Sequence, residues 1–360
     1  MNPHATQRAT LLAHLASAAR LACVALVLVM SVMTAAAAEE SPRISVREAC
    51  RTLGMTCTAG KDRHVTLLSR GARRGEVKAN TRNLMVDGVL IVLGDAVDER
   101  KGELWLSRID YERRFLPIWR PDLVPHLPKA PRVIVLDPGH GGWAAGAENK
   151  SLKVQEKVIT LDVALRLKPL LEAKGWTVVL TRERDEALAK SLEDDLDRRA
   201  ALANQAGADV FVSIHFDAAA NGALFGSEVF SYAPAHQWAT DSWNNRAKLN
   251  ALSRSGPSGI SDQEVPANRY DAANTLLAHA VYSRLVPALK TADLGERIAH
   301  FRVLANLNCP GILVEPAYLS NPMEALRVYS PDFRQQVAAA LAAGLEAYAA
   351  EIRDLQPAGR

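Results

Sequence analysis

The chain has 360 residues, 48% hydrophobic and 23% charged, which is typical of a soluble globular protein with room for two domains. Its formal net charge is +3, and losing Arg8 and Arg20 with the N-terminal segment described next would leave +1. A nucleic-acid-binding protein carries a strongly basic surface, so we expect no nucleic-acid partner.

Residues 1–38 have the pattern of a secretory signal peptide. Two arginines precede or border the apolar stretch "LACVALVLVMSVM", which is too short to span a bilayer, and the small residues of "TAAAAEE" favour cleavage after Ala38. An uncleaved membrane anchor is the alternative. No second span follows, so we expect an exported protein, periplasmic or associated with the cell wall, with no membrane contact after cleavage.

Residues 43–120 are predicted to form a small α/β module. A helix is expected in "SVREACRTLGM", strands in "HVTLLS" and "NLMVDGVLIVLG", and a strand followed by a short helix in "ELWLSRIDYERRF". Cys50 and Cys57 lie in this module, and export permits a disulfide between them without requiring it. The pattern resembles the stalk-type domain first named from copper amine oxidases. Its excess of basic residues suits an anionic polymer or a solvated face.

Residues 121–130 form a proline-rich linker, predicted to be extended because proline fixes φ and lacks a backbone donor. From residue 131 to 353, strands alternate with helices. Strands are expected in "RVIVL", "WTVVLT", "DVFVSIHF", "GSEVFSY", "HFRVL" and "GILVE", with amphipathic helices between or after most of them. This alternation predicts an α/β fold with a mostly parallel sheet covered by helices on both faces.

Three chemically capable side chains follow predicted strands. His140 lies in "VIVLDPGHGG", His215 in "FVSIHFD" and Glu315 in "GILVEPAYLSNP", while Glu156 opens the helix after the first strand. Because ligands bind at the carboxyl ends of strands in open α/β sheets, we expect all four at one rim. Taken singly, three of them have an ordinary interpretation: a tight turn or phosphate nest for His140, a satisfied core histidine for His215, and a solvated helix residue for Glu156. Glu315 is different, because a carboxylate that ends "GILV" would be semi-buried and needs a partner.

Together these residues predict a zinc hydrolase. Two imidazoles and one carboxylate, from His140, His215 and Glu156, form the kind of three-ligand set that leaves a fourth position for water or substrate. Zinc lowers the pKa of bound water and polarises a carbonyl. The remaining carboxylate, Glu315, is then the expected general base and acid. Glu228, on the strand after His215, is a weaker candidate for a further acid.

The motifs "VIVLDPGHGG", "EK", "VVLTRERD", "RRAALANQAGADVFVSIHFDA", "FRVL" and "ILVEPAYLSNP" resemble, in order, those of zinc-dependent N-acetylmuramoyl-L-alanine amidases of the amidase-3 type. The resemblance implies a twisted, mostly parallel six-stranded sheet flanked by helices. It implies zinc bound by His140, Glu156 and His215, with Glu315 as catalytic residue. It also implies hydrolysis of the amide between N-acetylmuramic acid and L-alanine in peptidoglycan.

Residues of about 233–273 form an insertion that is long for this family. Its tryptophans, Trp238 and Trp243, suit a glycan groove, and its length also suits a regulatory cover over the metal or a plain surface loop. A protein activator acting on the insertion is an expected partner. Two alternatives to the amidase stay open: a zinc carboxypeptidase or endopeptidase on the stem peptide, and a non-catalytic peptidoglycan-binding homologue.

Overall fold

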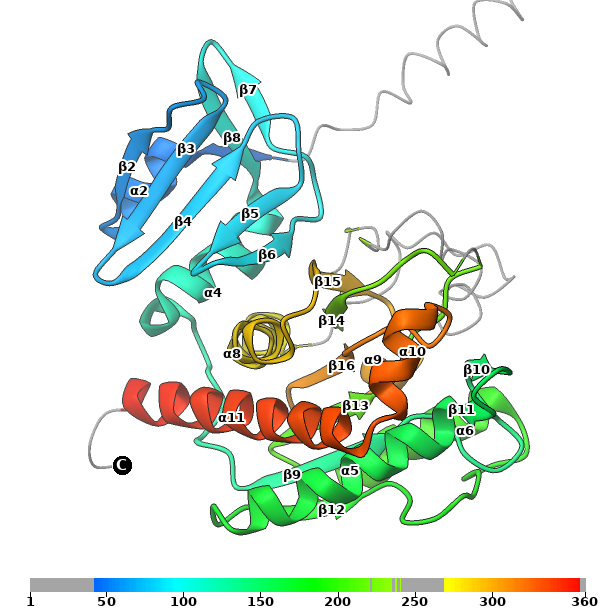
Figure 1. The fold of residues 1–360 in the computed structure, drawn as a ribbon. Helices are drawn as coiled ribbons and strands as arrows, with labels where there is room; N and C mark the ends of the chain where they lie inside the picture. Colours follow the sequence, from blue (N-terminus) through cyan, green and yellow to red (C-terminus); the bar gives the residue numbers. More distant parts are fainter. Residues whose placement is uncertain (1–41, 221, 235–236, 238–239, 241–268, 357–360) are drawn as a thin grey trace, which may run out of the picture. The chain divides into compact units, whose positions relative to one another are not determined.

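The computed structural model describes residues 42–220, 222–234, 237, 240 and 269–356 (Figure 1). The predicted signal segment, 1–38, lies outside these residues, as does most of the predicted insertion with both of its tryptophans. Among the described helices, none combines the length and the apolar character needed to cross a bilayer.

The first part of the described chain consists of short strands around one helix, α2 (Val46–Leu53). Ser45 caps this helix by accepting a hydrogen bond from the backbone N–H of Glu48, and Gly54 ends it in the left-handed conformation. The strands are β1 (Arg43–Ser45), β2 (Thr56–Ala59), β3 (Val65–Arg70), β4 (Arg73–Lys78), β5 (Asn83–Val86), β6 (Val89–Val92), β7 (Asp98–Arg100) and β8 (Glu103–Ser107).

Two local features of this part follow from particular residues. Cys50 and Cys57 form a disulfide, which is one of the two states that the sequence left open. Asp87 and Gly88 both have positive φ, 50° and 86°, as the two-residue turn of a β-hairpin requires, and they join β5 to β6.

Helical segments lead from the first part to the second. They are α3 (Arg108–Asp110), the π-helical segment Tyr111–Phe115 and α4 (Leu116–Trp119). The proline-rich stretch 121–130, expected to be extended, begins instead with a 3-10 turn at Pro121–Leu123. A proline at the first position of such a turn loses no hydrogen bond, because that N–H has no partner within the turn.

The second part alternates strands and helices. In chain order its elements are β9 (Val133–Pro138), β10 (Glu148–Asn149), β11 (Val154–Gln155), α5 (Glu156–Glu172), β12 (Thr177–Leu180), α6 (Leu192–Gln205), β13 (Val210–Ile214), β14 (Ser227–Tyr232), α8 (Asp271–Leu289), β15 (Asp293–Ala299), α9 (Arg302–Ala305), β16 (Gly311–Glu315), α10 (Pro322–Tyr329) and α11 (Pro331–Leu355). The α/β character predicted from the sequence is thus present.

The main sheet is larger than the six-stranded, mostly parallel sheet that was expected. The described residues form a mixed sheet of eleven strands in the order β12-β9-β13-β16-β14-β15-β6-β5-β4-β3-β2. β14 runs antiparallel to β16. The sheet continues past β15 because the outer edge of that strand pairs with β6, where Glu296 lies opposite Ile91 and the carboxylate of Asp293 accepts the N–H of Leu90 at 2.7 Å.

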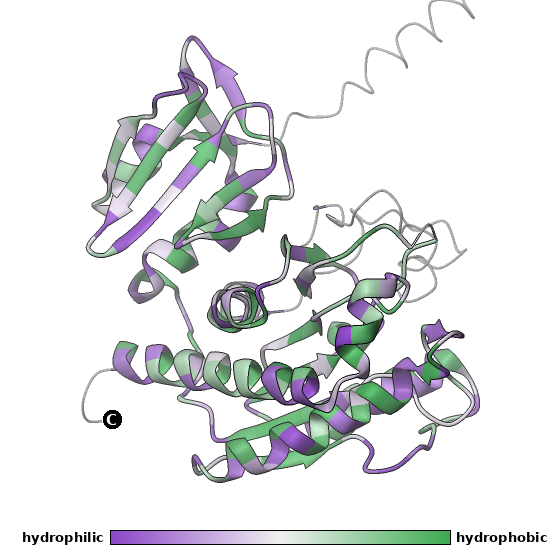
Figure 2. Cartoon of the chain, viewed as in Figure 1, coloured by the Kyte–Doolittle hydropathy of each residue, from purple (hydrophilic) through white to green (hydrophobic). Residues whose placement is uncertain are grey.

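Helices cover both faces of the sheet around β9, β13 and β16. On one face Ile134, Val212 and Val314 pack with apolar residues of α5, α8 and α11. On the other face Val135, Phe211 and Leu313 pack with α6 and α9. Figure 2 shows β9 as largely hydrophobic, whereas α5 and α11 alternate hydrophobic and hydrophilic residues, as helices with one buried face do.

The sequence-based assignment is wrong in one segment. "HFRVL" was expected to be a strand, but Arg302–Ala305 form α9, and the strand of this region is β15, seven residues earlier in polar sequence. Two charged side chains of β15 pair with partners from elsewhere: Glu296 contacts His279 at 2.7 Å and Arg297 contacts Glu228 at 2.8 Å. Such distant partners leave no signal in the local pattern.

Candidate metal centre

The structure brings three of the four predicted site residues together. His140 follows β9, Glu156 begins α5 and His215 follows β13, and their potential ligand atoms all lie within 4.8 Å of one another. His140 Nε2 lies 3.1 Å from Glu156 Oε2, and His215 Nδ1 lies 2.9 Å from Glu156 Oε1. The carboxylate therefore stands between two imidazoles, an arrangement that can hold a metal ion.

Glu156 is fully buried, and both of its oxygens are engaged. Oε1 accepts the backbone N–H of Phe216 at 3.0 Å, and Oε2 accepts that of Ala147 at 2.7 Å. Burial by itself raises the pKa of Glu156, but the adjacent His140 and the hydrogen bond with His215 outweigh it and hold that pKa well below its usual value. Its place at the first position of α5 also favours the anion, because helix N-termini carry partial positive charge.

The two histidines are suited to a metal in different ways. Burial lowers the pKa of His215, against the opposing effect of Glu156, so the neutral imidazole that metals bind is favoured. The buried Nε2 of His140 makes no hydrogen bond with any described residue, although it lies close to Glu156. A buried nitrogen without a hydrogen bond is costly, and a metal ion would satisfy it. The donor set therefore fits a metal.

The backbone around His140 is held in an unusual conformation. His140 has a φ of 62°, in the left-handed region that residues with a Cβ rarely adopt. A Cβ on Gly146 would lie 2.5 Å from Glu156 Oε2 and 2.7 Å from His140 Cδ2, so only glycine fits there. Strained backbone of this kind concentrates at functional sites and persists where the surroundings fix it.

Two buried arginines provide these surroundings. Arg199 donates to the carbonyls of His140 at 2.8 Å and Pro138 at 3.0 Å, and it pairs with the buried Asp137 at 2.8 Å. Arg182 donates to the carbonyls of Pro138 and Gly139, both at 2.9 Å. Arg199 lies 59 residues from His140 in the sequence, so local pattern could not connect the two.

Glu315, the predicted catalytic residue, ends β16 beside the strand that carries His215. The backbone N–H of His215 donates to the carbonyl of Val314 at 2.9 Å, so the two strands end together. Glu315 is buried, with 5% of its surface exposed. The segments beyond both strands also pair, since the N–H of Asp217 donates to Ala317 at 3.1 Å. Glu315 thus lies at the same rim as the three candidate ligands.

Glu228 lies directly opposite Glu315 in the antiparallel pairing of β14 with β16. Side chains of opposed residues in such a pair share one face of the sheet. Glu228 is buried, contacts Arg297 at 2.8 Å, and accepts a hydrogen bond from the hydroxyl of Tyr318. Burial raises the pKa of Glu228 to about 7, and the neighbouring Asp217 adds to this, while Arg297 opposes it.

The other histidines of the described residues lie outside this group. His64 pairs with Glu99 in the first part of the chain, and the buried His279 pairs with Glu296. Cys309 is a buried free thiol, and burial raises its pKa to about 12, so a thiolate ligand is disfavoured. Only the group of His140, Glu156 and His215 has the composition and spacing of a metal site within the described part of the chain.

Comparisons with known proteins identify the family of this chain. Residues 134–347 match the family model described as N-acetylmuramoyl-L-alanine amidase. The amidase AmiC of Escherichia coli is 34% identical over 235 residues, which cover 61% of this chain and 54% of that protein. AmiC of Neisseria meningitidis is 33% identical over 231 residues, covering 60% of this chain and 52% of that protein. The chain therefore spans about half the length of these two relatives.

A solved structure is also similar. The N-acetylmuramoyl-L-alanine amidase of Clostridium difficile 630 is 28% identical, with a TM-score of 0.46, over 61% of this chain and 97% of that one. The family model alone covers more than half of the present chain, including all four predicted site residues. This chain belongs to the N-acetylmuramoyl-L-alanine amidase family.

Proposed function

We propose that this protein is an exported, zinc-dependent peptidoglycan hydrolase that cleaves the amide between N-acetylmuramic acid and L-alanine of the stem peptide. One observation carries the proposal: His140, Glu156 and His215 offer ligand atoms within 4.8 Å of one another, inside the segment that matches the amidase family. Two imidazoles and a carboxylate are a common protein ligand set of catalytic zinc.

The residues divide the chemistry between them. His140, Glu156 and His215 would hold the zinc ion, which when bound polarises the amide carbonyl and lowers the pKa of water. Glu315 accepts a proton from the attacking water while the oxygen of that water bonds to the carbonyl carbon. Glu315 then delivers that proton to the amide nitrogen as the carbon–nitrogen bond breaks. Arg182 and Arg199 keep the loop of His140 in place through its carbonyls.

The other parts of the proposal rest on sequence. Export depends on the signal pattern of residues 1–38, and the domain division at 43–120, 121–130 and 131–353 remains a prediction, as does the likeness of the first module to a stalk-type domain. A protein activator acting on the insertion of about 233–273 also remains a prediction. Peptidoglycan is the proposed substrate because residues 134–347 match the N-acetylmuramoyl-L-alanine amidase family.

Product analysis tests this function. Purified protein incubated with isolated sacculi should release peptides with a free L-alanine amino end and leave muramic acid intact on the glycan. Protein stripped of metal and the Glu315→Gln variant serve as controls and should release far less. Cleavage within the stem peptide would favour a peptidase instead. Binding of sacculi without any released product would favour a non-catalytic homologue.

A further inference from the structure

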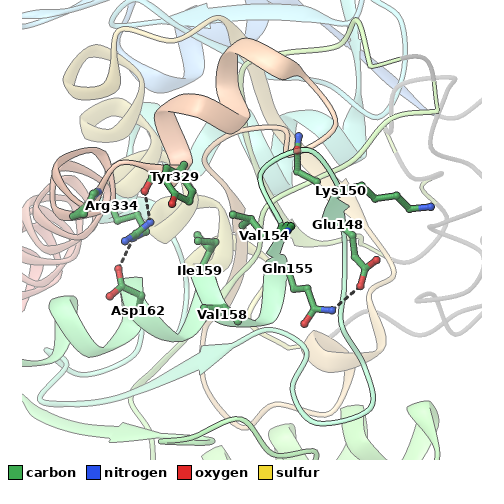
Figure 3. A pocket seen from close by; sticks show the side chains of 12 residues that line it. Glu148, Lys150, Val154, Gln155, Val158, Ile159, Asp162, Tyr329 and Arg334 are labelled. Carbon is green, nitrogen blue, oxygen red and sulfur yellow. Dashed lines mark hydrogen bonds and ion pairs between the residues drawn. The ribbon is translucent and has the colours of Figure 1, made fainter.

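A pocket lies along the first turns of α5, the helix that Glu156 opens (Figure 3). Its volume is about 720 Å³, within the usual range for ligand-binding pockets. The β10–β11 hairpin forms one wall, α5 forms another, and the junction of α10 with α11 closes the third side. No residue of this pocket has a role in the proposed chemistry.

The β10–β11 hairpin contacts both the candidate ligand Glu156 and the segment that follows Glu315. Gln155 lines the pocket and immediately precedes Glu156. The hairpin begins after Ala147, whose N–H donates to Glu156 at 2.7 Å. Asn149 donates from its side chain to the carbonyl of Leu319 at 3.1 Å, in the segment that follows Glu315. A ligand in the pocket would therefore lie against the same loops that hold the candidate ligands and base.

The pocket has the length of a short peptide. Its α5 wall extends from the start of the helix to Asp162, six residues beyond Glu156. At 1.5 Å per residue this is about 9 Å of helix. An extended peptide rises roughly 3.3 Å per residue, so this wall accommodates about three residues.

The lining combines apolar surface with an excess of one positive charge, since it contains three cationic and two anionic side chains. Val158 and Tyr329 are 54% and 55% exposed, which leaves their apolar atoms free to contact small side chains. The two acids of the pocket differ. Asp162 pairs with Arg334 at 2.6 Å, whereas Glu148 keeps its charge and accepts a hydrogen bond from the neutral amide of Gln155 at 2.7 Å (Figure 3).

Two lysines at the hairpin have no anionic partner among the described residues. The side-chain ammonium groups of Lys150 and Lys153 have no hydrogen-bond or ion-pair partner among the described residues, and both side chains are exposed. Cationic groups near an apolar wall favour a ligand that carries carboxylates on a partly apolar backbone.

We propose that this pocket binds the stem peptide of the substrate on the far side of the amide that is cleaved. The inference rests on the proposed function and adds a location for the peptide. The two parts of the substrate differ in charge: a glycan strand whose lactyl groups are in amide linkage offers no carboxylate, whereas a peptide ends in one. Lys150 and Lys153 therefore select the peptide over the glycan.

Substrates of two lengths test the proposal. For N-acetylmuramoyl-tripeptide, the variant K150A/K153A should raise KM about fivefold and leave kcat unchanged, the result expected when binding contacts away from the reacting bond are lost. For N-acetylmuramoyl-L-alanine amide, which lacks the later residues and the terminal carboxylate, the same variant should change neither constant. Lys174, exposed beyond the end of α5 and outside the pocket, provides the matched control variant Lys174→Ala.

A binding measurement separates this proposal from the proposed function. The tripeptide alone should bind the full-length protein in calorimetry at low salt, about fivefold more weakly to K150A/K153A, and the difference should shrink at high salt. Equal KM values for variant and parent on the long substrate, or an equal rise on both substrates, would overturn the peptide site. Weakened binding of peptide-free glycan chains to the variant would reassign the pocket to glycan. If the parent protein hydrolysed neither substrate but bound the tripeptide through these lysines, the proposed function would fail and the pocket would stand.

Discussion

Glu156 and Glu228 are both buried carboxylates at the same rim of the sheet, yet their surroundings move their pKa values in opposite directions. Burial favours the protonated form of each. At Glu156 the two neighbouring imidazoles outweigh burial and hold the pKa well below its usual value. At Glu228 one arginine competes with burial and with the nearby Asp217, and the pKa rises to about 7.

The difference shows how one residue type serves two tasks. A carboxylate kept ionised between imidazoles is prepared to bind a cation. A carboxyl group that changes protonation near neutral pH lies next to Glu315, where a proton has to be taken up and released in the proposed reaction. We call His140, Glu156 and His215 the metal half of the rim, and Glu228 and Glu315 the acid half. The two halves should therefore respond differently to substitution and to pH.

The largest effect is expected in the metal half. His140→Ala should remove one of three ligands, so the purified variant should hold far less than one zinc per chain and lose activity, measured by elemental analysis and by product release. His64→Ala, in the first part of the chain, is the control and should keep its zinc content and its activity. A His140 variant that retained a full complement of zinc would refute the ligand assignment.

The next largest effect is expected for Arg199, which holds the loop of His140 in place. Arg199→Met should lower the free energy of unfolding by about 3–5 kcal/mol, because Asp137 and Asp195 would remain buried without their cation. Urea denaturation measures the change. The control Arg166→Met removes a more exposed pair with Asp162 and should cost at most about 1 kcal/mol. Similar losses for both variants would mean that the buried network contributes little.

In the acid half, Glu315→Gln should keep zinc and fold but reduce kcat roughly a hundredfold, the usual contribution of general acid–base catalysis. Steady-state kinetics together with zinc content distinguish this from loss of a ligand. Turnover at the parental rate would assign the proton transfer to another group.

The smallest expected effect is the pH dependence of the thermal stability that Glu228 contributes. The pKa of Glu228 is raised from 4.5 to about 7 in the folded protein, so its protonation stabilises the fold at low pH, and this contribution is lost as pH rises from about 5 to 7. Glu228→Gln does not titrate. The Tm of the parent minus that of the variant should therefore fall between pH 5 and 8 at constant ionic strength. A difference that stays constant over this range would contradict the raised pKa.

The positions of the site residues could be predicted from sequence because they depend on local order. His140, His215 and Glu315 each follow a run of buried strand residues, and Glu156 opens a helix, so an α/β arrangement brings them to one rim. The disulfide between Cys50 and Cys57 was one of two open states, because seven residues of separation permit the bond without imposing it.

Only the tertiary structure decided what depends on partners distant in sequence. Arg199 reaches the loop of His140 from α6, and Glu228 becomes a neighbour of Glu315 through the antiparallel register of β14 with β16. The polar strand β15 was missed, and the sheet extends to β6, since both depend on pairings between remote segments. Hydrophobic periodicity reports which face of an element is buried. It carries no information about which distant strand, arginine or carboxylate will lie beside it, because that is fixed only when the whole chain packs.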